Sequence, residues 1–216
     1  MTDTSRCEGT WRPDPVDVRS GQPTRGWHDV LPGARGDASS GAVFDPERRN
    51  RFALWRVWDD AVTRRILFIG LNPSTADERV ADPTLRRCIG FAMKAGFGGL
   101  FLGNICSFRS PEPSRLPVRD QESERNYAAL CLMHVASHQV VAAWGAHTLP
   151  TGAKAVRERI EAWPDVMCFG ETKGGHPRHP LYLRSDTAMR PWHCQGTACS
   201  SASATSPLAA KATALA

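Results

Sequence analysis

Four short apolar runs, separated by stretches long enough for helices, constrain the fold of this chain more than any other feature. The runs are RILFIGL (65–71), LFLGNIC (100–106), QVVAAW (139–144) and DVMCFG (165–170). Nearly continuous apolar runs of this length are typical of strands covered on both faces. The helix-length segments lie at 83–95, 121–137 and 152–162. Alternation of strands and helices predicts an α/β fold, a three-layer α/β/α sandwich with a central, mostly parallel sheet of about four strands.

The ends of the chain differ in composition from this alternating part. Residues 1–40 are rich in Pro, Gly, Asp, Arg and Ser and show no periodicity, so we expect a flexible N-terminal arm. Residues 193–216 are small and mostly uncharged, which predicts a disordered C-terminal tail. A single α/β domain is therefore expected over 41–192, and the run NRFALWRVW (50–58) predicts an added edge strand.

Charge and cysteine content narrow the class of protein. The formal net charge is +5, which is compatible with a polyanionic partner and also with many ordinary enzymes. Seven cysteines without a Cys-x-x-Cys pair favour reduced thiols and a cytoplasmic protein. The sequence shows no export signal and no apolar stretch of membrane-spanning length, so we expect no membrane partner. A monomer is also expected.

The loop after the first predicted strand is unusually polar. It reads NPSTADERVA and leads to a helix whose start is marked by Asp82 as N-cap and Pro83 as first helical residue. In open parallel sheets, ligands bind where loops leave the carboxyl ends of strands and helix N-termini offer free N–H groups. The side chains of Asn72, Ser74, Thr75 and Asp77 are therefore site candidates. Asn, Ser, Thr and Asp also cap helices and form turns in ordinary loops. We give this structural role about the same weight as a role in ligand binding.

Three later loops are expected at the same edge of the sheet. Asn104 ends the second strand and offers two donors and an acceptor, the groups that read a nucleobase edge. Arg109 follows it and suits a phosphate or an acidic partner. Trp144, at the end of the third strand, is interpreted as a packing residue. His179, in the basic loop GETKGGHPRHPLYL, is the favoured candidate for hydrogen bonding to developing negative charge.

No cofactor or metal is predicted. The chain contains no Walker loop, no GxGxxG and no G-x-S-x-G elbow. The His134/His138 pair and the cysteines of the tail do not give four ligands at structural zinc spacing.

With these residues in view, the chain resembles a bacterial family catalogued as a domain of unknown function, family 1643. The matching motifs are RFALWRVWD, LFIGLNPSTAD with DPTLRRC, GGLFLGNICSFR, AAWG, HPLYL and a closing PW, spread over about 42–192. The LNPSTAD and DPT combination is the most specific of them. The resemblance does not bring an assigned chemistry.

The same landmarks are similar, more distantly, to those of the uracil-DNA glycosylase superfamily. The resemblance covers GLNPS, LGNICSF, AAWGAHT and HPLYL in order. It implies that Asn72 positions water, that Asn104 reads the base, and that the imidazole of His179 faces the departing base. The late loop reads His-Pro-Leu-Tyr, so the serine that would bind a DNA phosphate is missing, and no aromatic residue after Asn72 matches the ring that stacks on uracil.

These observations lead to an expected function and two alternatives. The expected activity is N-glycosidic hydrolysis at a modified or mismatched base, as in DNA repair, with Asp77 or Asp82 accepting a proton from water. Phosphate contacts are assigned to Ser74, Thr75, Arg86, Arg109 and Lys173. For any single basic residue of this set, a solvated surface position is the favoured reading. The alternatives are a hydrolase or transferase of a small nucleoside or nucleotide, and a nucleic-acid-binding relative without catalysis.

Overall fold

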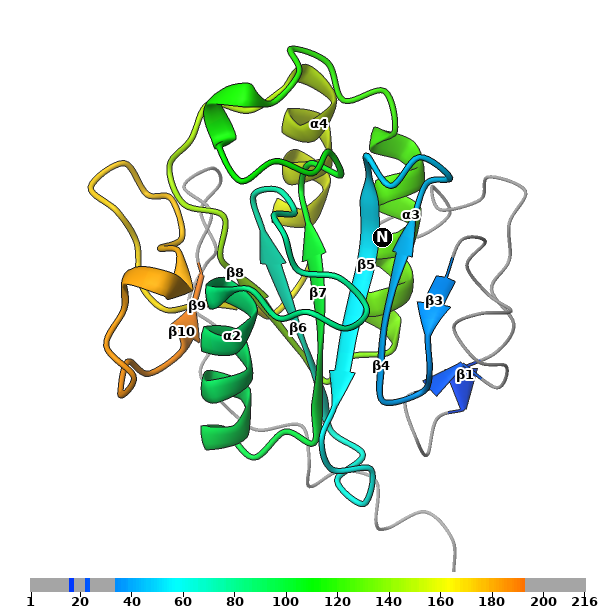
Figure 1. Cartoon of the computed structure of the whole chain (residues 1–216). Helices are drawn as coiled ribbons and strands as arrows, with labels where there is room; N and C mark the ends of the chain where they lie inside the picture. Colours follow the sequence, from blue (N-terminus) through cyan, green and yellow to red (C-terminus); the bar gives the residue numbers. More distant parts are fainter. Residues whose placement is uncertain (1–15, 18–21, 24–33, 193–216) are drawn as a thin grey trace, which may run out of the picture.

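The computed structural model describes residues 16–17, 22–23 and 34–192 (Figure 1). Two short strands, β1 (Val16–Asp17) and β2 (Gln22–Pro23), pair with each other. The main sheet contains eight strands in the spatial order β10-β9-β8-β6-β7-β5-β4-β3. In chain order these are β3 (Ala34–Gly36), β4 (Ser40–Phe44), β5 (Arg51–Val57), β6 (Arg65–Gly70), β7 (Gly99–Asn104), β8 (Gln139–Ala142), β9 (Val166–Cys168) and β10 (Arg190–Pro191).

The four predicted strands form the parallel part of this sheet. β6 pairs in parallel with both β7 and β8, and β8 pairs in parallel with β9. The connections include the predicted helices, observed as α2 (Pro83–Lys94), α3 (Ser123–Val135) and α4 (Thr151–Glu161). The predicted alternation of strands and helices is therefore confirmed for this half of the domain.

The sheet as a whole is larger and more antiparallel than predicted. β5 joins β7 antiparallel, β4 and β3 continue the sheet antiparallel beyond β5, and β10 adds antiparallel to β9. The prediction of a mostly parallel sheet of about four strands was wrong for this reason, and β5 is not an edge strand because β4 lies outside it. Short strands joined by tight turns leave a weak periodic signal, which is why SGAVF was missed.

The prediction of a flexible arm over 1–40 overlaps this antiparallel extension. β3 and the first residue of β4 lie inside that range. The rest of the arm, apart from β1 and β2, and the tail predicted at 193–216 lie outside the described residues.

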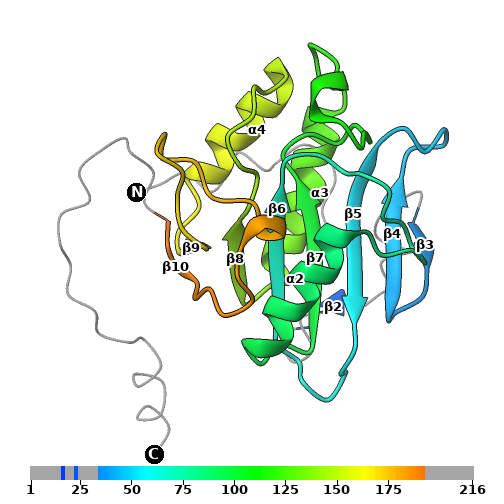
Figure 2. The ribbon, with the colours of Figure 1, turned by 60° about the vertical axis from the view of Figure 1, so that its left-hand side comes forward.

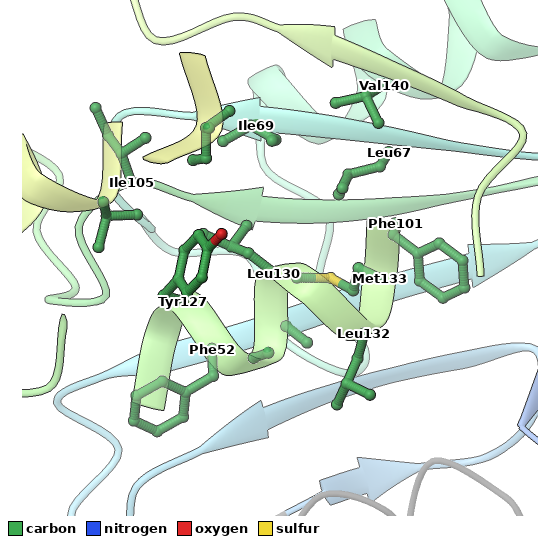
Figure 3. Packing of buried hydrophobic residues seen from close by; sticks show 14 of the residues in the cluster. Phe52, Leu67, Ile69, Phe101, Ile105, Tyr127, Leu130, Leu132, Met133 and Val140 are labelled. Atoms are coloured by element: carbon green, nitrogen blue, oxygen red, sulfur yellow. The ribbon is translucent and has the colours of Figure 1, made fainter. Parts of the chain in front are cut away.

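Helices cover both faces of the parallel strands, which gives three layers there (Figures 1 and 2). On one face α2 contributes Leu85, Cys88 and Phe91 to a cluster with strand residues such as Phe68 and Leu102. On the other face α3 and α4 pack against side chains that alternate with these along the strands. Figure 3 shows Tyr127, Leu130 and Met133 of α3 with Leu67, Ile69 and Phe101 of the strands, all buried. Burial on both faces explains why these strands read as continuous apolar runs.

Helix α2 begins where the sequence predicts. The Asp82 Oδ1 atom accepts the Leu85 backbone N–H at 2.7 Å, and Pro83 is the first helical residue. Gly96, with φ +75°, follows the helix end. The N-terminus of α2 is thus fixed at the edge of the sheet to which the carboxyl ends of β6, β7 and β8 point.

Within residues 34–192, none of the helices has both the length and the apolar character needed to span a bilayer.

Candidate functional site

A cavity of about 320 Å³ opens at the carboxyl ends of the parallel strands. Asn72 follows β6, Asn104 ends β7, Trp144 follows β8, and His179 immediately precedes the 3₁₀ turn η3 (Pro180–Tyr182). The strand order places the loops after β6 and β8 next to each other, and the crossovers that begin there run in opposite directions along the sheet, one to β7 and the other to β9. Loops diverge at such a position and ligand sites are common there.

The structure brings together five of the residues predicted from the sequence. Asn72, Ser74, Asp82, Asn104 and His179 all line this cavity. The other predicted residues, Thr75, Asp77, Arg86, Arg109 and Lys173, are not part of the lining.

Asn72 is held in one orientation by two backbone carbonyls. Its Nδ2 group donates to the oxygens of Pro73 at 3.0 Å and Ser110 at 2.7 Å. The Ser110 N–H in turn donates to Pro73 O at 2.8 Å, which joins the loops after β6 and β7. Because both donors of Asn72 point at the protein, the group that remains for a ligand or water is the acceptor Oδ1.

Asn104 is held through its side-chain oxygen, whereas Asn72 is held through its side-chain nitrogen. Its Oδ1 atom accepts a hydrogen bond from Arg51 Nη2 at 2.9 Å, which leaves the Nδ2 donor without a hydrogen-bond partner among residues 34–192. Its backbone oxygen accepts from Nδ2 of the buried Asn126 at 2.8 Å. A Cβ atom on Gly70 would come within 2.8 Å of Asn104 Nδ2, so glycine at that position leaves room for the amide. The sequence predicted that the Asn104 amide offers a ligand both donors and an acceptor. In the structure Arg51 occupies the amide oxygen, so the Nδ2 donor is the group that remains.

Arg51, the first residue of β5, is a buried cation at the cavity. Its side chain is 2% exposed and donates to Ala76 O and Asn104 Oδ1, both at 2.9 Å. No carboxylate of the described residues lies within 4.0 Å of it. Burial lowers the pKa of Arg51 to about 10, although the charge of Asp82 raises it, so the guanidinium stays protonated at neutral pH.

His179 lines the cavity, and its hydrogen bonding determines which ring nitrogen can donate. Its Nδ1 atom accepts the Leu181 backbone N–H at 3.3 Å, so the proton of the neutral ring lies on Nε2. Burial lowers the pKa of His179, and His147 lowers it further against the opposing effect of Asp82. The loop that carries His179 is joined to the end of β8 by a hydrogen bond of 2.9 Å from Gly145 N–H to Pro177 O.

Asp82 both caps helix α2 and lines the cavity. One carboxylate oxygen caps α2 through Leu85, and the residue, 7% exposed, also lines the cavity. Its second oxygen has no hydrogen-bond donor among residues 34–192. Asp82 therefore offers a hydrogen-bond acceptor at the cavity, as Asn72 Oδ1 does.

Asp77 is placed in a turn. Its Oδ1 atom accepts the N–H groups of Arg79 at 2.8 Å and Val80 at 2.7 Å. Burial alone would raise the pKa of Asp77, but these backbone hydrogen bonds and nearby Arg48 bring it below its usual value. The turn-forming interpretation applies to Asp77, and its assignment as a catalytic residue gains no support from its position.

Side-chain hydrogen bonds to its backbone carbonyl groups hold the loop 74–78 in place. Arg109 donates to Ser74 O, Arg51 to Ala76 O and Arg56 to Asp77 O. Ser40 Oγ donates to Glu78 O at 2.6 Å. Side chains from β4, β5 and the loop after β7 thus hold the polar loop against the antiparallel half of the sheet.

The predicted phosphate contacts are dispersed. Thr75 and Lys173 are exposed, and Arg86 is exposed with a hydrogen bond to Ala81 O. Arg109 is partly buried, donates to Arg48 O at 3.1 Å and lies over the Phe44 ring, so its position serves the loop. Only Ser74 of this group lines the cavity.

Sequence reasoning missed several residues of the lining. Arg51, Thr84, His147 and Tyr182 all line the cavity, and the Tyr182 side chain is 79% exposed beside the His179 ring. Trp144, interpreted as packing, is indeed buried against Trp192 with ring centroids 5.0 Å apart, and it also lines the cavity. The available signal for Arg51 was a charge at the start of the apolar run RFALW.

One comparison with known proteins identifies a family. The model of the family described as "Protein of unknown function (DUF1643)" matches residues 51–181, more than half of the chain. The chain belongs to the DUF1643 family. The match begins at Arg51 and ends at Leu181, so it includes all the predicted residues that line the cavity of this DUF1643 chain. Searches of curated proteins and of solved structures gave no match.

The described part of this DUF1643 chain contains no group of three or more His, Cys, Asp or Glu side chains that could hold a metal ion.

Proposed function

We propose that this protein hydrolyses the N-glycosidic bond of a nucleotide unit and releases the base. One observation carries the proposal: Asn72, Asp82, Asn104 and His179 line a single cavity. Their hydrogen bonds to the protein leave acceptors on the first two residues and donors on the last two. N-glycosidic cleavage separates charge, with a cationic sugar on one side and an anionic base on the other. A site with acceptors and donors in fixed orientations serves both ends of that separation.

The resemblance to the uracil-DNA glycosylase superfamily supports the same proposal. It assigned roles to Asn72, Asn104 and His179 from motifs far apart in the chain. These three residues lie at one cavity, at the carboxyl ends of parallel strands. On this reading the first substrate to consider is a modified or mismatched base in DNA.

In the proposed reaction, Asn72 Oδ1 accepts a hydrogen bond from a water molecule and directs it toward the C1′ carbon. The free oxygen of Asp82 accepts the proton of that water as the C–O bond forms. His179 Nε2 and Asn104 Nδ2 donate to the base while the C–N bond breaks and the electron pair stays with the base. The departing base then takes up a proton from solvent and Asp82 returns its proton to solvent, which balances the hydrolysis.

A free nucleotide is the second candidate substrate. The residues expected to bind DNA phosphates, Thr75, Arg86 and Lys173, are outside the cavity lining, whereas the buried cation Arg51 is part of it. A site for one nucleotide needs a charge inside the cavity and does not need a basic surface track.

The test is direct measurement of base release. The full chain is incubated with oligonucleotides that carry different modified or mismatched bases and, separately, with nucleoside 5′-monophosphates, and the released base is quantified. Abasic sites in the oligonucleotides are also cleaved with alkali. We expect release from at least one class, together with its loss in Asn72→Ala.

A matched control is Val80→Ala, because Val80 is 56% exposed in the same loop and does not line the cavity. Equal loss of release in both variants would point to a disturbed loop and would count against the role of Asn72. No release from either substrate class would rule out the hydrolase.

A further inference from the structure

Arg51 is unusual because it combines burial, positive charge and access to a cavity. An arginine side chain in a protein interior normally faces a carboxylate, since an uncompensated buried charge is strongly destabilising. Arg51 instead donates to one backbone carbonyl and one amide oxygen, with no described carboxylate within 4.0 Å. Neutral acceptors engage two of the five N–H groups of Arg51 and leave its charge without an adjacent counterion.

The charged neighbours of Arg51 do not supply that counterion. Arg56 and Arg109 are cations, and both oppose its protonation. The acidic groups Asp82 and Asp77 favour it, but only from beyond ion-pair distance. One carboxylate oxygen of Asp82 is already engaged in capping α2.

Donors surround this guanidinium at the cavity. Asn104, 4% exposed, has an Nδ2 group without a hydrogen-bond partner among the described residues, and Arg51 holds its other end. Thr84, in the first turn of the 12-residue helix α2, also lines the cavity. Its N–H is the first-turn donor that remains among the described residues, because Pro83 has no N–H and the N–H groups of Leu85 and Arg86 donate to Asp82. A helix N-terminus, an unpartnered buried amide and a buried cation together favour an anionic ligand.

We propose that Arg51 and Asn104 form a subsite for an anionic oxygen of the ligand, adjacent to the N-terminus of α2. The oxygen belongs either to a phosphate group of a nucleotide or to the base that departs as an anion. This inference names the ligand chemistry of the cavity and rests on the proposed function only for the second of these sources.

The test is a binding measurement, so it does not depend on turnover. Calorimetric titration of the full chain uses inorganic phosphate, a nucleoside 5′-monophosphate and the matching nucleoside. A further pair of probes is a nucleobase that is ionised at the assay pH and its neutral N-methylated form. Binding of phosphate and of the monophosphate, with much weaker binding of the nucleoside, identifies phosphate as the source. Preference for the ionised base over its neutral form identifies the departing base.

Arg51→Met retains much of the side-chain volume and removes the charge. We expect the anionic probes to bind at least about tenfold more weakly to it, which is the effect of losing one charge-assisted hydrogen bond. The matched control is Arg56→Met. Arg56 also lies on β5 and also donates to a carbonyl of the loop 74–78, but it does not line the cavity. Binding should be unchanged in that variant.

Two further variants keep the test informative if Arg51→Met does not fold. Arg51→Lys preserves the charge and should retain binding within about tenfold, and Asn104→Ala should lose it while Arg51 remains. The proposal is overturned if no anionic probe binds the unaltered protein at millimolar concentration, or if Arg51 and Arg56 variants lose binding equally. Base release without anion binding would refute this subsite and leave the hydrolase standing, and anion binding without base release would do the reverse.

Discussion

The Nη2 atom of Arg51 lies 2.9 Å from the Oδ1 atom of Asn104, although the two residues are 53 positions apart in the chain. This contact joins the antiparallel half of the sheet, where β5 begins, to the parallel half, where β7 ends. It also decides which end of the Asn104 amide faces the cavity. The antiparallel extension is therefore part of the site as well as of the fold.

Replacement of His179 by alanine should reduce the rate of base release by at least about a hundredfold, because removal of one donor to a developing anion has effects of that size. The measurement is the single-turnover rate of base release with a substrate identified in the panel. His176→Ala is the matched control, since His176 belongs to the other His-Pro step of the same loop and does not line the cavity. An unchanged rate in His179→Ala would remove His179 from the mechanism.

Replacement of Gly70 by alanine should impair the site while the protein stays folded. The added methyl group would lie 2.8 Å from Asn104 Nδ2, and the end of that side chain is the part that has to move. We expect base release or anion binding to weaken by about tenfold or more, as for loss of one well-placed hydrogen bond to a charged group. Gly90→Ala in α2 provides the control, because nothing lies within 4 Å of its new methyl group. Similar function in the two variants would contradict this role of Gly70.

Asn126 on α3 should matter for stability. Its fully buried side chain donates to the backbone oxygens of Asn104 at 2.8 Å and Ile105 at 3.3 Å, where β7 ends. In Asn126→Ala these carbonyls lose their donor, which should lower the free energy of unfolding by about 1–3 kcal/mol. Urea denaturation measures the difference. A change below about 0.5 kcal/mol, the range of ordinary surface substitutions, would show that these hydrogen bonds are replaced by water.

His134 should make stability depend on pH. Burial lowers the pKa of this imidazole, which stacks on Trp163 with ring centroids 4.1 Å apart. The unfolded chain, with a pKa of about 6.5, therefore binds the proton before the folded chain does as the pH falls. The contribution of His134 to stability is present above that pH and is lost as the pH falls toward the lower folded-state pKa.

His134→Phe keeps an aromatic ring against Trp163 and removes the titrating group. The unaltered protein should lose more unfolding free energy than this variant between pH 7.5 and pH 5, values chosen to bracket the unfolded pKa of about 6.5, as measured by urea denaturation at each pH. Parallel pH dependences would show that His134 does not contribute.

The sequence by itself determined the parallel half of the domain and most of its polar edge. Apolar runs buried on both faces and the capping signals Asp82, Pro83 and Gly96 are local patterns, so β6 to β9 and α2 to α4 followed from them. Asn72 and Asn104 were found for the same reason, because each follows or ends a strand that the pattern located. His179 was found from the His-Pro steps of the loop after the fourth strand.

Only the tertiary structure decided the antiparallel extension, the place of Arg51 and the orientation of each amide. β3 and β4 are short strands whose pairing depends on partners across tight turns and carries little periodic signal. Asp77 and Asp82 look alike in sequence, yet one closes a turn and the other reaches the cavity. Which group of Asn72 or Asn104 faces a ligand depends on hydrogen bonds from residues distant in the chain, and no local pattern encodes those contacts.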